Sequence, residues 1–141
     1  MSEIYAGNCH CEAIGWKFQT DIEPSQWVVR SCQCSFCRTH GARCTSDPAG
    51  SVDIRGHEAG ALMRYRFGLE TADFLVCGKC GVYIGAMMES PDGTFATLNL
   101  NALETSVGVQ WDATPVFYDD EGSEGRIARR VSRWTPVATV T

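Results

Sequence analysis

Cysteine is the residue type in this chain whose spacing points most directly to chemistry. The 141 residues include eight cysteines. Thiolates are ligands for zinc; a structural zinc site closes at four ligands, whereas a catalytic one keeps a position open for water or substrate. The sequence therefore predicts metal binding at three clusters, spaced C-x-C, C-x-C-x-x-C and C-x-x-C: Cys9 and Cys11; Cys32, Cys34 and Cys37; Cys77 and Cys80.

The C-x-x-C cluster is the most specific of the three. Cys77 and Cys80 stand in "CGKCG", where Gly78 and Gly81 permit the tight turn on which two cysteines bind one ion. A redox C-x-x-C is the alternative, but a motif of that kind is expected to open a helix. The residues that follow, "VYIG", are typical of a strand. We therefore expect a metal site here that needs two further ligands.

The remaining ligands can be divided in more than one way. In the most economical partition Cys9 and Cys11 supply the missing pair, which leaves the middle cluster as three thiolates with one position open. Spacing alone does not prove this partition. Cys44, seven residues after the middle cluster, is a candidate fourth ligand that would close that site. We favour the other interpretation, in which Cys44 is a small buried thiol.

The three clusters carry a family resemblance. In chain order, "GNCHC", "SCQCSFCR" and "CGKCGVYIG" resemble the glutathione-dependent formaldehyde-activating enzyme family, which includes centromere protein V. The resemblance covers Gly7 to about Leu103 and departs from the usual motifs at Glu12 and Gln33. It implies a small β-tent with two zinc ions. The structural zinc would lie on Cys9, Cys11, Cys77 and Cys80, and a catalytic, labile zinc on Cys32, Cys34 and Cys37.

The resemblance also implies an activity. It is that of a carbon–sulfur lyase which forms S-(hydroxymethyl)glutathione from glutathione and formaldehyde, or a related thiol adduct. A zinc ion with an open position binds a thiol and lowers its pKa, although three thiolates leave that ion a poorer acid than three neutral histidines would. The alternative is a non-catalytic zinc module that carries glutathione or binds a protein partner. Redox sensing by the middle cluster is a third interpretation.

Glutathione has two carboxylates and one ammonium group, so its pocket is expected to offer cations and amides. Arg38, directly after Cys37, and Asn99 are the leading candidates for these contacts. Lys79, Asn101 and His40 are weaker ones. Four arginines near the C-terminus share one face of an expected helix, and we interpret that face as solvated rather than as an anion site: Arg126, Arg129, Arg130 and Arg133.

Short β-like runs separated by turn residues dominate the chain. Strands are expected over residues 13–18, 26–30, 51–54, 61–67, 72–76, 82–87 and 94–100. A short helix is expected over 35–40, stopped by Gly41. The pattern predicts an all-β fold, a small zinc-stapled β-tent of sandwich-like antiparallel sheets with short helical turns. We expect a single domain over residues 1–141, with the motifs in 7–103.

Composition and charge narrow the function classes. The formal charge is −5, and it falls to about −8 once seven thiolates bind two zinc ions, because ligating cysteines lose their protons. Such a charge argues against nucleic acid as a partner. No apolar run reaches the length of a membrane span, and the N-terminus does not resemble a signal peptide. We therefore expect a cytoplasmic protein without a membrane partner, whose oligomeric state the sequence does not indicate.

Overall fold

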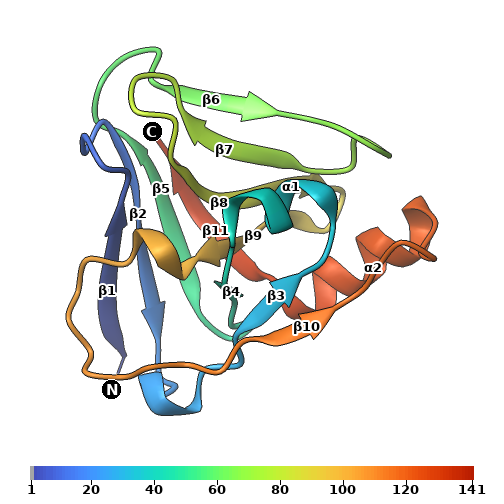
Figure 1. Cartoon of the computed structure of the whole chain (residues 1–141), viewed down its shortest axis with the longest axis horizontal. Coiled ribbons are helices and arrows are strands. Elements are labelled where there is room, and N and C mark those ends of the chain that lie inside the picture. Colours follow the sequence, from blue (N-terminus) through green and yellow to red (C-terminus); the bar gives the residue numbers. More distant parts are fainter. Residues whose placement is uncertain (1) are drawn as a thin grey trace.

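The computed structural model describes residues 2–141, and most of its regular structure is β-strand (Figure 1). The predicted all-β class is confirmed. Two helices, α1 (Ser35–His40) and α2 (Ser123–Arg133), and two 3₁₀ turns, η1 (Pro24–Gln26) and η2 (Leu100–Ala102), complete the fold. The strands are β1 (Glu3–Asn8), β2 (Ile14–Thr20), β3 (Arg30–Cys32), β4 (Cys44–Thr45), β5 (Ser51–Gly56), β6 (Leu62–Tyr65), β7 (Asp73–Cys77), β8 (Tyr83–Ser90), β9 (Gly93–Asn99), β10 (Thr114–Val116) and β11 (Thr135–Val140).

The strands of the described chain join in one open, branched sheet. Its main path runs β1-β2-β5-β11-β9-β4-β3-β10, and β8, β7 and β6 branch from β9 in that order. Most pairs are antiparallel, as expected. Two pairs are parallel, β11 with β5 and β10 with β3, and both join segments far apart in sequence. Through these two pairs, β10 and β11 of the C-terminal third of the chain join the rest of the sheet.

The core lies between the β1-β2-β5 end of the sheet and the β8–β9 hairpin. Strand β2 alternates between buried and exposed side chains along its second half, and its Trp16 indole N–H donates to the carbonyl of Ile84 on β8 at 2.9 Å. Burying a large apolar side chain contributes about 1.5–3 kcal/mol. This packing holds the turn after β1 close to the turn after β7, where two of the cysteine pairs lie.

One expected strand is not formed. Residues 26–30 are predicted as a strand, but the chain there follows the 3₁₀ turn η1, which opens at Pro24, and only Arg30 enters β3. Trp27 is the reason: its ring packs edge-on against Tyr5 at 4.8 Å and stacks on Trp111 at 5.5 Å. Tertiary packing of one aromatic side chain thus outweighs the local strand pattern.

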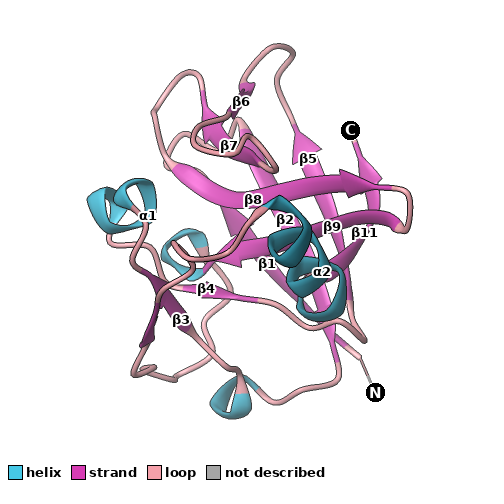
Figure 2. Ribbon diagram, turned by 90° about the vertical axis from the view of Figure 1, so that its right-hand side faces the viewer, coloured by secondary structure: helices cyan, strands magenta, loops and turns pink. Residues whose placement is uncertain are grey.

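The two helices follow from local signals. α1 covers the predicted residues and ends at Gly41, whose φ of 58° is the left-handed conformation that glycine adopts without strain. α2 packs its apolar residues, with Trp134 after it, on the β7–β8–β9 part of the sheet (Figure 2). Neither helix is long and apolar enough to cross a membrane, and the same holds for every helix of residues 2–141.

Candidate metal centres and the cavity beside them

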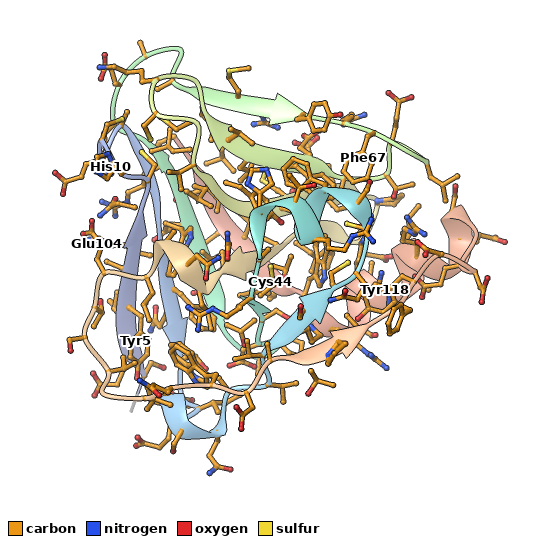
Figure 3. The ribbon with its side chains drawn as sticks, viewed as in Figure 1. Tyr5, His10, Cys44, Phe67, Glu104 and Tyr118 are labelled. Atoms are coloured by element: carbon orange, nitrogen blue, oxygen red, sulfur yellow. The ribbon has the colours of Figure 1, made fainter. Side chains whose placement is uncertain are left out.

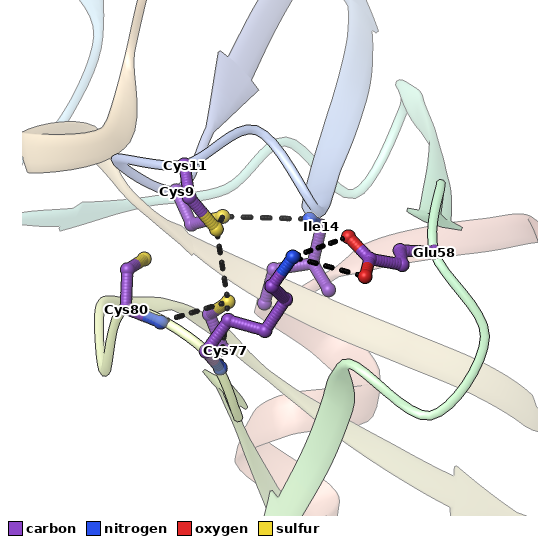
Figure 4. A network of polar contacts seen from close by, with 7 residues as sticks. Cys9, Cys11, Ile14, Glu58, Cys77 and Cys80 are labelled. Carbon is purple, nitrogen blue, oxygen red and sulfur yellow. Dashed lines mark hydrogen bonds and ion pairs between the residues drawn. The ribbon is translucent and has the colours of Figure 1, made fainter.

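Four cysteines from two turns converge at one end of the sheet: Cys9, Cys11, Cys77 and Cys80. All four sulfur atoms lie within 4.8 Å of one another. Cys11 Sγ is 3.8 Å from that of Cys9 and 3.6 Å from that of Cys77 (Figure 4). Tetrahedral zinc with Zn–S bonds of about 2.3 Å requires separations of about 3.8 Å. The donor set and its spacing therefore fit a zinc ion, and none of these cysteines forms a disulfide.

Backbone amides donate hydrogen bonds to two of these sulfurs. The Ile14 N–H donates to Cys9 Sγ, and the N–H groups of Lys79 and Cys80 donate to Cys77 Sγ, each at 3.4 Å. Hydrogen bonds to a sulfur favour its negatively charged form. The two turns are therefore prepared to hold thiolates, the form of cysteine that binds a metal.

The middle cluster forms a second convergent group. Cys32 ends β3, Cys34 is the N-cap of α1 and Cys37 lies in that helix, and their sulfurs also lie within 4.8 Å of one another. The Cys37 N–H donates to Cys34 Sγ at 3.3 Å, and hydrogen bonds from the Cys32 and Cys37 thiols lower the pKa of Cys34. Three sulfurs with a stabilised thiolate fit a metal ion that keeps one ligand position free.

Cys44 and His40 do not join this group. Cys44 lies beneath it on β4 and is buried, as predicted. Burial raises its pKa to about 12, so it stays a neutral thiol. His40 is exposed, and its ring lies 4.4 Å from that of Phe36. Within residues 2–141 the sulfurs of the second group are therefore three.

A cavity of about 90 Å³ opens beside the three cysteines. Its lining comes from elements distant in sequence, and Figure 3 shows Cys44, Phe67 and Tyr118 placed around this region. Phe67, Phe74 and Tyr83 form an aromatic wall. The lining also includes four arginines, called the arginine wall below: Arg30, Arg126, Arg129 and Arg130. The cavity thus combines sulfur ligands, apolar surface and positive charge, the mixture expected of a small-molecule site.

The parallel pair β3–β10 brings the arginines to the cysteines. Val116 lies opposite Cys32 in this pair, and the Gln33 N–H donates to the Val116 carbonyl at 2.9 Å. The chain then continues through Tyr118 into α2. The interpretation of the arginine face of α2 as solvated is therefore wrong for the three arginines that line the cavity, and only Arg133 is exposed.

Sequence reasoning named these arginines but did not place them at the cavity, because their position depends on the β3–β10 pairing. That pairing joins three-residue strands more than eighty positions apart, which no local pattern reveals. A signal was present in the helical spacing of the arginines themselves. The apolar residues Ile127 and Val131 of the same helix pack on the sheet. The arginines lie on another face of the helix, which is therefore directed away from that contact.

The predicted glutathione contacts lie outside the cavity lining. Arg38 is exposed on α1. Asn99 is buried and its side chain is used within the fold: its NH₂ donates to the Tyr83 carbonyl at 2.9 Å, and its oxygen accepts the Arg43 N–H at 3.3 Å. That contact ties the end of β9 to β8 and to the residue before β4. A role for Arg38 or Asn99 in binding glutathione stays a prediction, and the cavity gives it no support.

Two of the weaker candidates for glutathione contacts, Lys79 and Asn101, also use their side chains in contacts outside the cavity. The ammonium group of Lys79 pairs with the Glu58 carboxylate at 2.8 Å beside the four-cysteine site (Figure 4). The Asn101 side chain accepts from Arg43 Nε at 2.8 Å and donates to the Gly41 carbonyl at 2.9 Å. Both contacts connect surface segments and leave these side chains away from the cavity.

Comparison with known proteins agrees with the arrangement of the cysteines. The family model described as "glutathione-dependent formaldehyde-activating enzyme" matches residues 4–120, most of the chain. The chain belongs to this family. The formaldehyde-activating enzyme match contains all eight cysteines and ends before α2. The arginine wall from α2 therefore lies outside the part of the chain that the family comparison describes.

A solved structure supports the fold of this family member. The crystal structure of a Rhodobacter sphaeroides protein is similar with a TM-score of 0.58 and 27% sequence identity. The similarity covers 79% of this chain and 99% of that one. No curated protein matches the chain in sequence.

Proposed function

We propose that the protein is a two-zinc carbon–sulfur lyase-type enzyme that joins glutathione and formaldehyde to give S-(hydroxymethyl)glutathione. The observation that carries the proposal is the three-cysteine group, whose sulfurs converge at the wall of a cavity. The family match supports a glutathione- and formaldehyde-related function. Cys9, Cys11, Cys77 and Cys80 would hold a structural zinc ion, and Cys32, Cys34 and Cys37 a second one.

The second zinc, when bound, supplies a Lewis acid that binds the substrate thiol and lowers its pKa. In the reaction the sulfur forms a bond to the formaldehyde carbon, the carbonyl π electrons move to oxygen, and the thiol proton ends on that oxygen. The arginine wall adds positive charge beside the sulfurs, which favours a thiolate over a thiol. The aromatic wall adds apolar surface to the cavity, and charges beside such a surface are screened less than in bulk water.

The cysteines also support a proposal about the cellular compartment of the protein. All eight are free thiols, an arrangement typical of reducing compartments, where clustered cysteines bind metals. The proposal therefore includes a cytoplasmic location. It includes neither nucleic acid nor a membrane as partner, consistent with the formal charge of −5.

The decisive assay is the rate of adduct formation measured against the spontaneous reaction. Exchange between ¹³C-formaldehyde and its glutathione adduct can be followed by NMR with zinc-loaded protein, with free zinc and with neither. We expect the protein to raise the rate and Cys34→Ser to abolish the increase. A rate equal to the spontaneous one in all samples would leave a non-catalytic thiol-binding module as the correct interpretation.

A further inference from the structure

The cavity contains a buried cation that the fold does not neutralise. Arg130 on α2 is only 6% exposed. One guanidinium nitrogen donates to the Thr71 hydroxyl at 2.8 Å, and the group lies 4.8 Å from the centre of the Trp134 ring. Within residues 2–141 no carboxylate pairs with Arg130, and its Nε has no hydrogen-bond partner. A buried charge in this state is costly unless something else pairs with it.

The other arginines of α2 in this wall differ from Arg130 in having a carboxylate nearby, although Arg126 Nε also lacks a hydrogen-bond partner. Glu121 binds Arg129 at 3.0 Å and lies 3.9 Å from Arg126 Nε, and the Arg129 guanidinium lies 3.5 Å above the Tyr118 ring. These contacts leave Arg130 as the cation most in need of an anion. Burial lowers the pKa of Arg130 to about 10, which still leaves it charged at neutral pH.

The size of the cavity limits what the anion can be. The space is about 90 Å³, whereas an apolar cavity of about 150 Å³ holds one benzene molecule. The enclosed part of a ligand therefore has few atoms, and it must reach from the three-cysteine group to the arginine wall within that space. A thiol with a carboxylate a few bonds from its sulfur meets both conditions.

We propose that Arg130 binds the carboxylate of a thiol ligand in this cavity. The cavity thereby selects small mercaptocarboxylates, or the mercaptocarboxylate portion of a larger thiol. The sulfur of the ligand lies at Cys32, Cys34 and Cys37. The proposal rests on the thiol-binding role given above and narrows the class of thiol. Arg30, half-buried in the lining of the same cavity and hydrogen-bonded to the Ser46 hydroxyl, adds a second positive charge.

A purely internal role for Arg130 makes a different prediction. Three thiolates with one zinc ion carry a net charge of −1, and a buried arginine nearby could serve only to balance it. In that case replacing Arg130 weakens zinc binding at the second site. It does not change the relative affinity for charged and neutral thiols, so the two roles are separable by experiment.

Isothermal titration calorimetry with zinc-loaded protein at pH 7 tests the proposal. The probes are 3-mercaptopropionate, neutral 2-mercaptoethanol and propionate, with a phosphine as reductant so that no other thiol competes. We expect 3-mercaptopropionate to bind at least about tenfold more tightly than 2-mercaptoethanol, since a charge-assisted hydrogen bond contributes that much. Arg130→Met should remove the preference and leave the affinity for 2-mercaptoethanol unchanged.

Two variants control this result. Arg133→Met removes an exposed charge from the same helix and should keep the full preference, and Arg130→Lys, which retains the charge, should keep part of it. Zinc content and circular dichroism report whether each variant is loaded and folded. If Arg130→Met fails to fold, the comparison of Arg130→Lys with the native protein still tests the proposal. A preference for 3-mercaptopropionate that is unchanged by loss of the guanidinium contradicts it.

Three further outcomes would overturn it. Equal affinity of the native protein for the charged and neutral thiols would refute the role of Arg130 and leave the proposed thiol chemistry intact. Absence of binding by every thiol would refute both proposals together. A preference that survives in Arg130→Met would assign the selectivity to other arginines.

Discussion

At the scale of single residues, the seven clustered cysteines are not equivalent. Four of them meet at two turns where backbone amides donate to the sulfurs of Cys9 and Cys77. A metal bound there would connect β1 and β2 to β7 and β8. The other three lie around a single short helix at the edge of a cavity. We therefore expect a metal on the first group to stabilise the fold, and loss of a metal from the second group to do less damage to it.

Replacing one cysteine of each group should separate these roles. We expect Cys77→Ser to lose one zinc per chain and to lower the melting temperature by roughly 10 °C or more, because a metal cross-link in a small domain contributes several kcal/mol. Cys34→Ser should also lose one zinc but shift the melting temperature by only a few degrees. Elemental analysis and thermal denaturation measure both effects. Equal destabilisation by the two substitutions would contradict the division of roles.

Predictability from sequence also differs from residue to residue. The cysteines could be grouped because metal ligands repeat at short, recognisable spacings, and the structure brings together the same two sets. Arg38 was a candidate only because it follows Cys37 in sequence, and the helix turns it outward. Arg130 could not be placed at the cavity because its hydrogen-bond partner Thr71 lies 59 positions away in sequence, although Trp134 ends the same helix.

At the scale of elements, α1 holds the middle cluster through its two ends. Cys34 caps its beginning, and Gly41 ends it in the left-handed conformation, with an N–H that donates to the Arg38 and Cys37 carbonyls. Gly41→Ala should cost about 1 kcal/mol, because a residue with a side chain is strained at positive φ. It should also weaken zinc binding at the second site, measured by competition with a chromophoric chelator.

A matched glycine on the other helix serves as its control. Gly125 lies in α2, and a methyl group added there would meet no atom within 4 Å, as is also the case at Gly41. Since Gly125 has an ordinary helical backbone, Gly125→Ala should be neutral or stabilise the protein by up to about 1 kcal/mol. Destabilisation of the same size at both positions would argue against the capping role of Gly41.

The unpredicted strands include β1, which pairs with its neighbour β2, and otherwise are short or pair with strands distant in sequence. β4 and β10 have two and three residues, too few to show an alternating pattern. β10 and β11 form their parallel pairs with β3 and β5 from the opposite end of the chain. By contrast, β2, β5, β7, β8 and β9 were located approximately, because each combines bulky or β-branched residues with flanking turn residues.

At the scale of the whole molecule, proton competition should separate the two metals. Zinc ligands must be deprotonated, so lowering the pH protonates the thiolates and releases the ion. With one sulfur fewer, the second site should release its zinc at a higher pH than the first. A titration that follows zinc release and circular dichroism together should show one zinc leaving while the protein stays folded. Release of both ions in a single step with unfolding would contradict this expectation.

The central claim is that the three-cysteine group binds a metal with a position left open for a substrate thiol. Cadmium-113 NMR of the cadmium-substituted protein tests it directly, because the chemical shift depends on the number of sulfur ligands. Without thiol we expect two resonances, one from four-sulfur and one from three-sulfur coordination. Adding glutathione or 3-mercaptopropionate should move only the second, into the four-sulfur range. A single resonance would contradict the account, and so would two resonances whose chemical shifts do not change when the thiol is added.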